Sequence, residues 1–260
     1  MMHFNYFFFD LCPYMVILHL LMKIGILGCK GRMGQVLMAG VTASPGATLV
    51  GGADKGDDAQ DLIKKSDAVI DFTSPEVSLG FARLAAKHKK IHVIGTTGFT
   101  DTQLAELKKL AAKTPIFWSP NMSIGVNLAC ILTQEAAKLL DTSYDIEILE
   151  MHHRHKKDSP SGTALLLGEA AANGRKTKFS RNIKHDRSGQ RKIGDIGYAV
   201  LRGGSVIGDH SVIFAGDHDR IEITHKSSSR DIYAKGAIQA ALWLKGKKPK
   251  LYSMKDMLFS

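Results

Sequence analysis

Residues 23–34 read KIGILGCKGRMG, a short apolar run that ends in glycine and leads into a glycine-rich turn. Residues 31–44, GRMGQVLMAGVTAS, continue with apolar side chains at helical spacing. A strand that passes through such a turn into a helix is the usual first unit of an α/β sheet. The residues that follow repeat the alternation of strand and helix.

The alternation continues to residue 121. Further strands are predicted over residues 47–54, 67–73, 91–97 and 115–121, and helices over residues 77–90 and 100–113. Strands that alternate with helices of this length form βαβ units and give a parallel sheet covered on both faces. We therefore expect a Rossmann-type, doubly wound α/β domain over residues 22–122, completed by residues 231–260, whose helix packs back on it.

After Asn121 the pattern becomes that of an α+β domain. Helices are predicted over residues 123–140 and 161–174, and a strand over residues 144–153. Residues 193–228 alternate apolar with polar side chains, which predicts three antiparallel strands with bends at residues 202–204 and 216–218. We expect residues 123–230 to form a substrate-binding and oligomerisation domain, because a mainly antiparallel open sheet can pair with another subunit.

Composition excludes several classes of protein. The chain has 260 residues, 44% hydrophobic and 23% charged, as in ordinary globular proteins. Three widely separated cysteines exclude both a disulfide framework and a CxxC metal site and favour a reducing, cytoplasmic compartment. The net charge of +10 permits a nucleic-acid partner, but no helix-turn-helix, zinc-finger or RNA-stacking motif accompanies it.

Residues 1–21 differ from the rest of the chain, because they are rich in aromatic residues and contain no Lys or Arg. They lack the cationic start and small-residue cleavage site of a signal peptide. We interpret them as an extension outside the fold, produced by a start codon assigned too early. The alternative, a membrane-surface anchor, lacks the basic face that favours anionic lipid.

The turn at residues 28–34 has the spacing GxxGxxG between a strand and a helix. In that position backbone N–H groups can approach a pyrophosphate at the positive end of the helix dipole. A glycine turn that only packs tightly is the alternative. Asp54, 20 residues beyond Gly34, favours the dinucleotide, because an acidic residue there accepts hydrogen bonds from a ribose diol. Lys55 could hold a 2′-phosphate, so the pair indicates use of both NADH and NADPH.

Residues 150–163, EMHHRHKKDSPSGT, are the richest in chemical groups. Residues 152–157 are all histidine, arginine or lysine, so we expect a loop that is exposed or faces a cleft. A solvated basic patch is the common meaning of such a run. Adjacent histidines without carboxylate or cysteine partners make a poor zinc site. The residues that follow favour a binding site over a surface patch. Ser161-Gly162-Thr163 begin a helix, and its free N–H groups and the two hydroxyls can bind a carboxylate.

Six segments together resemble one enzyme family. In order they are GCKGRMG, VIDFTSPE, VIGTTGF, SPNMSIGVN, EMHHRHKKDSPSGTA and RIEITHKSSSR. They are similar to 4-hydroxy-tetrahydrodipicolinate reductase, also called dihydrodipicolinate reductase, from Met22 to near the C-terminus. The resemblance implies NAD(P)H-dependent reduction of a dicarboxylate, with loss of water, to tetrahydrodipicolinate on the diaminopimelate route to lysine. It also implies a homotetramer built through the antiparallel sheets, with no nucleic-acid or membrane partner.

The resemblance also assigns roles to residues. It assigns proton transfer to His152 and Lys156, and substrate binding to His153, Gly162 and Thr163. It assigns cofactor binding to Gly28, Cys29, Lys30, Gly31, Arg32, Met33, Asp54, Lys55, Gly95, Thr96, Thr97, Ser119, Pro120, Asn121 and Met122. No metal is implied. Residues 55–66 are short, which implies that one helix or loop of longer relatives is trimmed, and Pro120 removes a backbone donor from its loop.

The implied mechanism adds hydride to a conjugated imine. A cationic His152 or Lys156 then stabilises the electrons pushed onto the ring and donates a proton. Two rivals remain. An amino-acid dehydrogenase would share the first domain but does not need residues 152–163, and a nucleic-acid or NAD-sensing module would have no turnover.

Overall fold

The computed structural model describes residues 21–179 and 189–260. The chain forms two compact units: residues up to Trp118 with Ile238–Leu251, and Ser119–Ala237 with Tyr252–Ser260. The last residues join the second unit because α9 (Met254–Leu258) packs against α6 (Ile124–Leu139). Residues 1–20, which we interpreted as an extension, lie outside the described residues.

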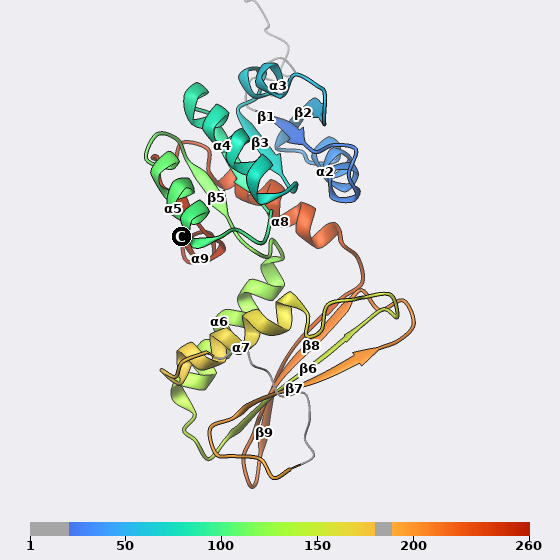
Figure 1. Cartoon of the computed structure of the whole chain (residues 1–260), viewed down its shortest axis with the longest axis vertical. Coiled ribbons are helices and arrows are strands. Elements are labelled where there is room, and N and C mark those ends of the chain that lie inside the picture. The colour runs from blue at the N-terminus through green and yellow to red at the C-terminus, as the bar shows by residue number, and fades with distance from the viewer. Residues whose placement is uncertain (1–20, 180–188) are drawn as a thin grey trace, which may run out of the picture. The chain divides into compact units, whose positions relative to one another are not determined.

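The first unit is a parallel sheet with helices (Figure 1). Its elements are β1 (Met22–Leu27), α2 (Arg32–Thr42), β2 (Ala47–Ala53), α3 (Ala59–Lys65), β3 (Ala68–Asp71), α4 (Pro75–His88), β4 (Ile91–Ile94), α5 (Asp101–Leu110) and β5 (Ile116–Trp118). The strand order is β2-β1-β3-β4-β5-β10, with β10 at Leu251–Tyr252. All pairs among β1 to β5 are parallel, which confirms the predicted Rossmann-type architecture. The order reverses between β1 and β3, where sheets of this kind bind ligands.

Local sequence explains where these helices begin. Thr100 caps α5 in a reciprocal capping box with Gln103, and Pro75 begins α4 after Ser74. The buried faces of α4 and α5 supply Leu79 and Leu107 to a core that continues into the sheet. The helix α3 lies in the short stretch after β2, for which no element was predicted. Asp58 caps it by accepting a hydrogen bond from the Asp61 N–H.

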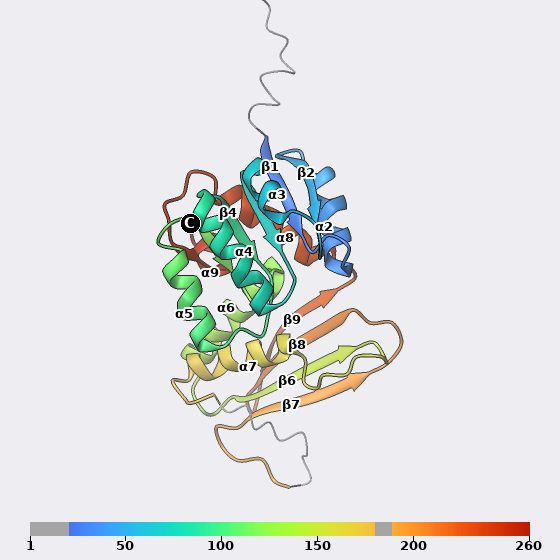
Figure 2. The ribbon, with the colours of Figure 1, turned by 45° about the horizontal axis from the view of Figure 1, so that its top comes forward.

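The second unit places two helices on a four-stranded sheet (Figure 2). Its elements are α6, β6 (Asp145–His152), α7 (Gly162–Gly174), β7 (Ile196–Arg202), β8 (Gly208–Ala215), β9 (Arg220–Ser227) and the start of α8 (Asp231–Trp243). The strand order is β7-β6-β8-β9. The pairs β6–β8 and β8–β9 are antiparallel, so the prediction of a mainly antiparallel sheet is confirmed.

One predicted feature of this sheet is wrong. The bend at residues 202–204 was expected to join two antiparallel neighbours, but β7 and β8 are not adjacent. Instead β6 lies between them, and β7 pairs with β6 in the parallel direction, with Glu150 opposite Val200. The bend at residues 216–218 does join neighbours, since β8 and β9 form an antiparallel pair. Alternation along β7 specifies a strand but not its partner.

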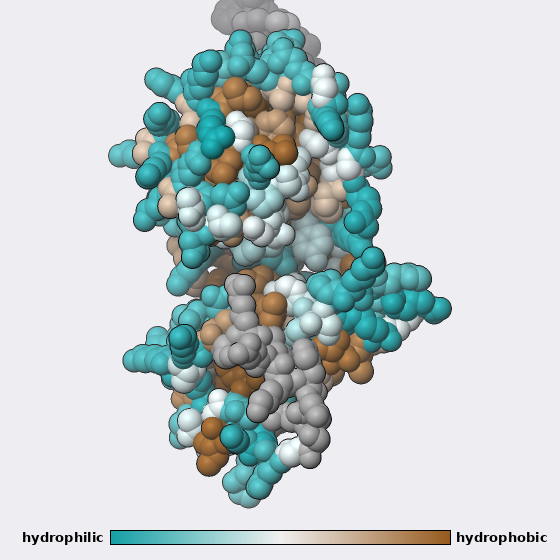
Figure 3. Space-filling view, viewed as in Figure 1, coloured by the Kyte–Doolittle hydropathy of each residue, from teal (hydrophilic) through white to brown (hydrophobic). Residues whose placement is uncertain are grey.

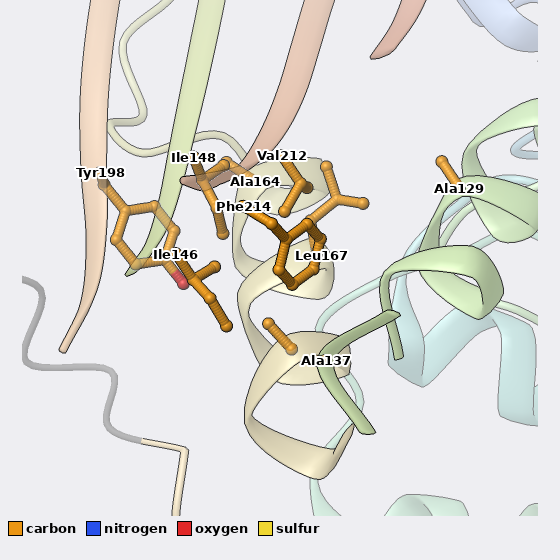
Figure 4. Packing of buried hydrophobic residues seen from close by; sticks show 10 residues of the cluster. Ala129, Ala137, Ile146, Ile148, Ala164, Leu167, Tyr198, Val212 and Phe214 are labelled. Atoms are coloured by element: carbon orange, nitrogen blue, oxygen red, sulfur yellow. The ribbon is translucent and has the colours of Figure 1, made fainter. Parts of the chain in front are cut away.

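The core of the second unit lies between the sheet and α6 and α7 (Figure 4). Ile146, Ile148, Val212 and Phe214 project from β6 and β8 toward Leu167 of α7. Along β6 every second side chain is buried, so positions 146, 148, 150 and 152 share the inner face. This alternation brings Glu150 and His152 to the same side as the core.

Much of the surface in view in Figure 3 is hydrophilic, with hydrophobic residues scattered over both units. Exposed large apolar side chains include Leu128 and Leu132 of α6 and Leu201 of β7. Among the residues that the structure describes, no helix has the length and apolar character needed to cross a membrane.

Candidate active site

The glycine turn of the first unit lies between β1 and α2. Gly28 has φ +73°, a conformation that favours glycine, and a Cβ on Gly34 would lie on the Gly28 carbonyl oxygen. The helix α2 starts after Gly31 without a side-chain cap. Its first N–H groups, on Arg32 and Met33, are therefore the donors that an anion could use.

Asp54 is tied directly to this turn. One carboxylate oxygen accepts a hydrogen bond from the Lys30 N–H at 2.8 Å, and the other accepts one from the Lys55 N–H at 2.8 Å. Those two bonds, from Lys55 first and then Lys30, lower the pKa of Asp54, so the side chain is a carboxylate at neutral pH. Lys30 also lies 3.8 Å from Asp57. The structure thus brings together the predicted pyrophosphate turn and the predicted ribose acceptor.

The predicted segment Gly95-Thr96-Thr97 follows β4 in the same unit. Thr96 is buried, and its Oγ1 accepts a hydrogen bond from Ser78 Oγ at 2.8 Å. Its carbonyl oxygen accepts one from the Trp118 indole at 3.1 Å. Thr97 is exposed. Thr96 therefore anchors the segment, and Thr97 is the residue whose side chain is open to a ligand.

The loop from Ser119 to Met122 belongs to the second unit, unlike the other predicted cofactor residues. Ser119 is buried and donates to the Asn121 carbonyl at 2.7 Å, while Pro120 is exposed. Asn121 Nδ2 donates to Thr163 Oγ1 at 3.1 Å. The structure thus joins a residue predicted to bind cofactor to one predicted to bind substrate.

The basic block is only partly a loop. His152 is the last residue of β6, as the strand predicted over residues 144–153 implied, is 7% exposed and faces inward, so the loop expected over residues 152–157 begins one residue later. The strand pairing that ends at His152, opposite Arg202, causes this burial. His153 and Lys156 are half-buried, and Arg154, His155 and Lys157 are exposed.

Glu150 is the buried partner of His152. Its side chain is fully buried, and Oε2 lies 2.6 Å from His152 Nδ1. Arg202, at the end of β7, donates to Oε2 from Nη1 at 2.8 Å and to Oε1 from Nη2 at 3.0 Å. The Ser161 N–H also donates to Oε1, at 2.9 Å. The carboxylate therefore contacts a histidine, an arginine and the residue that caps α7.

These contacts determine the charges in the site. Burial alone would raise the pKa of Glu150, but the hydrogen bonds from Arg202, His152 and Ser161 outweigh it and lower that pKa. Burial lowers the pKa of His152, and the bond to Glu150 only partly opposes the shift. The imidazole of the free protein therefore favours its neutral form at pH 7, and a cationic His152 or Lys156 stays the expectation for the reaction itself.

Lys156 is held by a neighbouring carboxylate. Its Nζ donates to both oxygens of Asp158, at 2.9 and 2.8 Å. The lysine side chain is 19% exposed, whereas that of Asp158 is 62% exposed. Arg202 Nη2 donates to the Asp158 carbonyl at 2.7 Å. The loop that carries Lys156 is thus fixed to the same arginine that binds Glu150.

The predicted carboxylate cradle begins α7, as the sequence indicated. Ser161 is its N-cap and accepts from the Ala164 N–H at 3.1 Å. Gly162 is exposed, with open space where a Cβ would lie. Thr163 accepts from Asn121, which leaves its hydroxyl proton free to donate. The N–H groups of Gly162 and Thr163 lie in the first turn, where an anion can bind.

His210 and Gly208 were not predicted as parts of this site. His210 Nε2 lies 2.8 Å from Ser161 Oγ, and its ring packs edge-on against His152 with centroids 5.0 Å apart. Burial lowers the pKa of His210 to about 4, so it is neutral. A Cβ on Gly208 would lie 2.9 Å from His152 Nε2, so the glycine leaves room beside that atom. Apolar-polar alternation through β8 was the only sequence signal for His210.

Within the described part of the chain, no group of three or more His, Cys, Asp or Glu side chains is placed to hold a metal ion. The functional groups of the second unit are instead one buried carboxylate, neutral imidazoles, one lysine and an open helix start. This set can bind a carboxylate and move a proton.

Known proteins match both halves of the chain. The family model "Dihydrodipicolinate reductase, N-terminus" matches residues 22–122, and "Dihydrodipicolinate reductase, C-terminus" matches residues 125–258. The protein named 4-hydroxy-tetrahydrodipicolinate reductase 1 of Mesorhizobium japonicum is 46% identical over 91% of this chain and 97% of its own length. The 4-hydroxy-tetrahydrodipicolinate reductase of Agrobacterium fabrum is 47% identical over 91% of this chain and 96% of its own length.

A solved structure agrees with these matches. Dipicolinate-bound dihydrodipicolinate reductase from Paenisporosarcina sp. TG-14 is 27% identical, with a TM-score of 0.75 over 90% of this chain and 97% of that one. Together with the two family models, this similarity confirms the resemblance found in the sequence. The chain belongs to the dihydrodipicolinate reductase family and is an oxidoreductase with a Rossmann-type nucleotide-binding domain.

Proposed function

We propose that this chain reduces 4-hydroxy-tetrahydrodipicolinate with NADH or NADPH, using His152 and Lys156 for proton transfer and the start of α7 for substrate binding. The reduction itself, on the diaminopimelate route to lysine, follows from family membership. The observation that supports the residue assignment is the buried Glu150, which contacts both His152 and the Ser161 N–H. A proton-transfer group and an anion cradle are thus held by one carboxylate.

The substrate is a small dicarboxylate. We assign one of its carboxylates to the N–H groups of Gly162 and Thr163 and to the Thr163 hydroxyl, because all three are donors at the positive end of a helix. His153 is the further contact that the family resemblance implies. Dipicolinate, which occupies the related Paenisporosarcina reductase, is also a dicarboxylate.

The first unit supplies a site that fits a dinucleotide. Gly28 and Gly34 permit the close turn, and Asp54 is an ionised acceptor beside it. We assign the pyrophosphate to the start of α2 and the adenosine ribose to Asp54 and Lys55, with Thr97 as a further contact; the residues 119–122 of the second unit are the other cofactor contacts that the family resemblance implies. When bound, the nicotinamide supplies hydride from its C4 atom. No metal ion takes part in this proposal.

Lys156 and His152 would then act in sequence on the substrate. The Lys156 ammonium stabilises negative charge that builds up on the substrate ring, because it is a cation close enough to the buried imidazole to lower its pKa. A dianionic substrate raises the pKa of His152, so the imidazole takes a proton from solvent at Nε2 and delivers it to the ring. Asp158 keeps Lys156 in place through the ion pair, and its own side chain is exposed to solvent.

A spectrophotometric assay tests the function. We expect oxidation of NADH that depends on freshly made condensation product of aspartate semialdehyde and pyruvate. Family membership and the paired site residues of the second unit are the reasons. DNA retention that falls with salt, without such oxidation, would favour the nucleic-acid module instead. Oxidation that requires an amino acid would favour the dehydrogenase rival.

Use of both cofactors is a separate expectation. The Asp54 carboxylate favours the ribose diol of NADH, whereas the adjacent Lys55 favours the phosphate of NADPH. We therefore expect the two kcat/KM values to differ by less than about a thousandfold, or roughly 4 kcal/mol. A larger preference for either cofactor, measured with saturating substrate, would contradict dual use.

Subunit association belongs to the same proposal. The sheet of the second unit ends in the edge strands β7 and β9. An open edge or face of this kind can pair with another copy. We propose a cytoplasmic homotetramer built through these sheets, whose mass light scattering would give.

A further inference from the structure

We propose that Glu150 is a positioning residue that sets the tautomer of His152, holding the proton on Nδ1 so that Nε2 is the nitrogen that exchanges a proton with substrate. This inference rests on the proposed function for its kinetic part. Its structural part concerns the free protein and does not depend on the substrate.

The Glu150 side chain is ionised. Its side chain is completely buried, yet it receives donors from Arg202 at both oxygens and from the Ser161 N–H. A carboxylate with these donors is ionised, and an ionised carboxylate can only accept hydrogen bonds. The atom that faces it at 2.6 Å, His152 Nδ1, must therefore carry a proton.

The protonation of the His152 ring follows from the charge of Glu150. Since His152 is neutral and Nδ1 carries the proton, Nε2 has a free lone pair. The charged and titratable groups around the ring come from four elements: Glu150 on β6, Arg202 on β7, His210 on β8, and Lys156 in the loop after β6. Within the described residues, Glu150 is the one acceptor that faces Nδ1. Removing its charge removes the group that fixes this tautomer.

An amide in place of the Glu150 carboxylate would change the hydrogen bond to His152. In Glu150→Gln the NH₂ group must replace one oxygen. At the Oε1 position it would face Arg202 Nη2 and the Ser161 N–H, neither of which can accept a hydrogen bond. At the Oε2 position it would also face a donor, Arg202 Nη1 at 2.8 Å, but there it meets His152 Nδ1, which becomes an acceptor if the proton moves to Nε2. The amide therefore selects that position and reverses the tautomer.

With the amide nitrogen of Glu150→Gln toward His152, we expect kcat to fall while KM changes little. The oxygen left at the Oε1 position still accepts from Ser161, so the cradle stays in place and the substrate KM changes by less than about threefold. The ring now has its lone pair on the wrong nitrogen, so kcat falls about tenfold or more, a smaller loss than removal of a general acid causes. A role limited to stability would lower the melting temperature without this split.

The pH profile provides a second kinetic readout. Glu150 raises the pKa of His152 against the effect of burial, and the protonated ring is the form that donates. Activity that needs this form is lost as pH rises through that pKa. In Glu150→Gln the pKa falls, so the descending limb of kcat moves to lower pH.

Nitrogen-15 NMR of histidine-labelled free protein tests the proposal directly. We expect His152, assigned by its loss in His152→Gln, to carry its proton on Nδ1 in the wild type and on Nε2 in Glu150→Gln. Glu147→Gln is the matched control, because Glu147 lies on the same strand and also binds an arginine, Arg191, at 3.1 Å. It should change neither the tautomer nor kcat.

Two outcomes would overturn the proposal. One is a wild-type His152 with its proton on Nε2, a result that needs no variant to fold. The other is a folded Glu150→Gln protein with unchanged tautomer and kcat. If the tautomers are as expected but no reductase activity is found, the proposed function fails while the positioning by Glu150 stands.

Discussion

Replacing His152 by glutamine should lower kcat by about 10²-fold or more, because the proton transfer that a positioned side chain supplies is worth at least that much. Glutamine keeps a polar group at the end of β6 and can still face Glu150, so the second unit should remain folded. It cannot take a proton at neutral pH. The measurement is steady-state reduction with both substrates saturating, together with the melting temperature of the variant.

His218→Gln is the matched control. His218 lies in the turn between β8 and β9 and is exposed, so the same substitution there should leave kcat unchanged. Turnover of His152→Gln equal to that of the control would remove His152 from the mechanism. A loss of kcat accompanied by unfolding would be separated from a chemical loss by the melting temperature.

Lys156→Ala should also lower kcat by about 10²-fold or more. Lys156 is the half-buried lysine of the loop, and we expect it to stabilise charge on the substrate ring. Its loss also frees Asp158, whose carboxylate would then repel a dianionic substrate. We therefore expect KM to rise in the same variant, measured by initial rates over a range of substrate concentrations.

Lys157→Ala distinguishes this role from that of a basic surface. Lys157 is the next residue and is exposed, so its removal changes the net charge equally without touching the site. If both variants lose activity to the same small extent, and added salt reduces the difference from wild type, the block acts as a solvated patch. Normal turnover in Lys156→Ala would exclude the lysine from charge stabilisation and from proton transfer.

The first unit was predictable because its pattern is local. The strands β1, β3 and β4 are short apolar runs, each followed by a helix of ten or more residues, and this alternation allows few topologies. The helix α3 was missed because seven residues carry too little periodicity. The strand partners of β7 were predicted wrongly because alternation describes the faces of one strand, whereas its neighbour depends on packing of the whole unit.

The candidate site was also predicted only in part from the sequence. A dense run of charges indicated a loop, and for residues 153–157 that interpretation agrees with the structure. At His152 the strand predicted over residues 144–153 is the better description, and Arg202, Ser161 and His210 compensate the burial of polar groups there. The alternation of β6 contained the signal for this burial, since Ile146, Ile148, Glu150 and His152 follow one another at period two. Glu150 is polar in a position that the pattern reserves for the core.

The central place of β6 in its sheet also constrains how the site comes into being. Glu150 finds Val200 and His210 on either side of it, and Arg202 follows it by 52 residues. During synthesis on the ribosome, β6 therefore emerges well before either neighbouring strand. Contacts between distant residues form late, because the intervening chain must first be ordered. The buried carboxylate and its histidine can pair fully only after β7 and β8 have been made, so this unit completes its proton-transfer machinery near the end of its own folding.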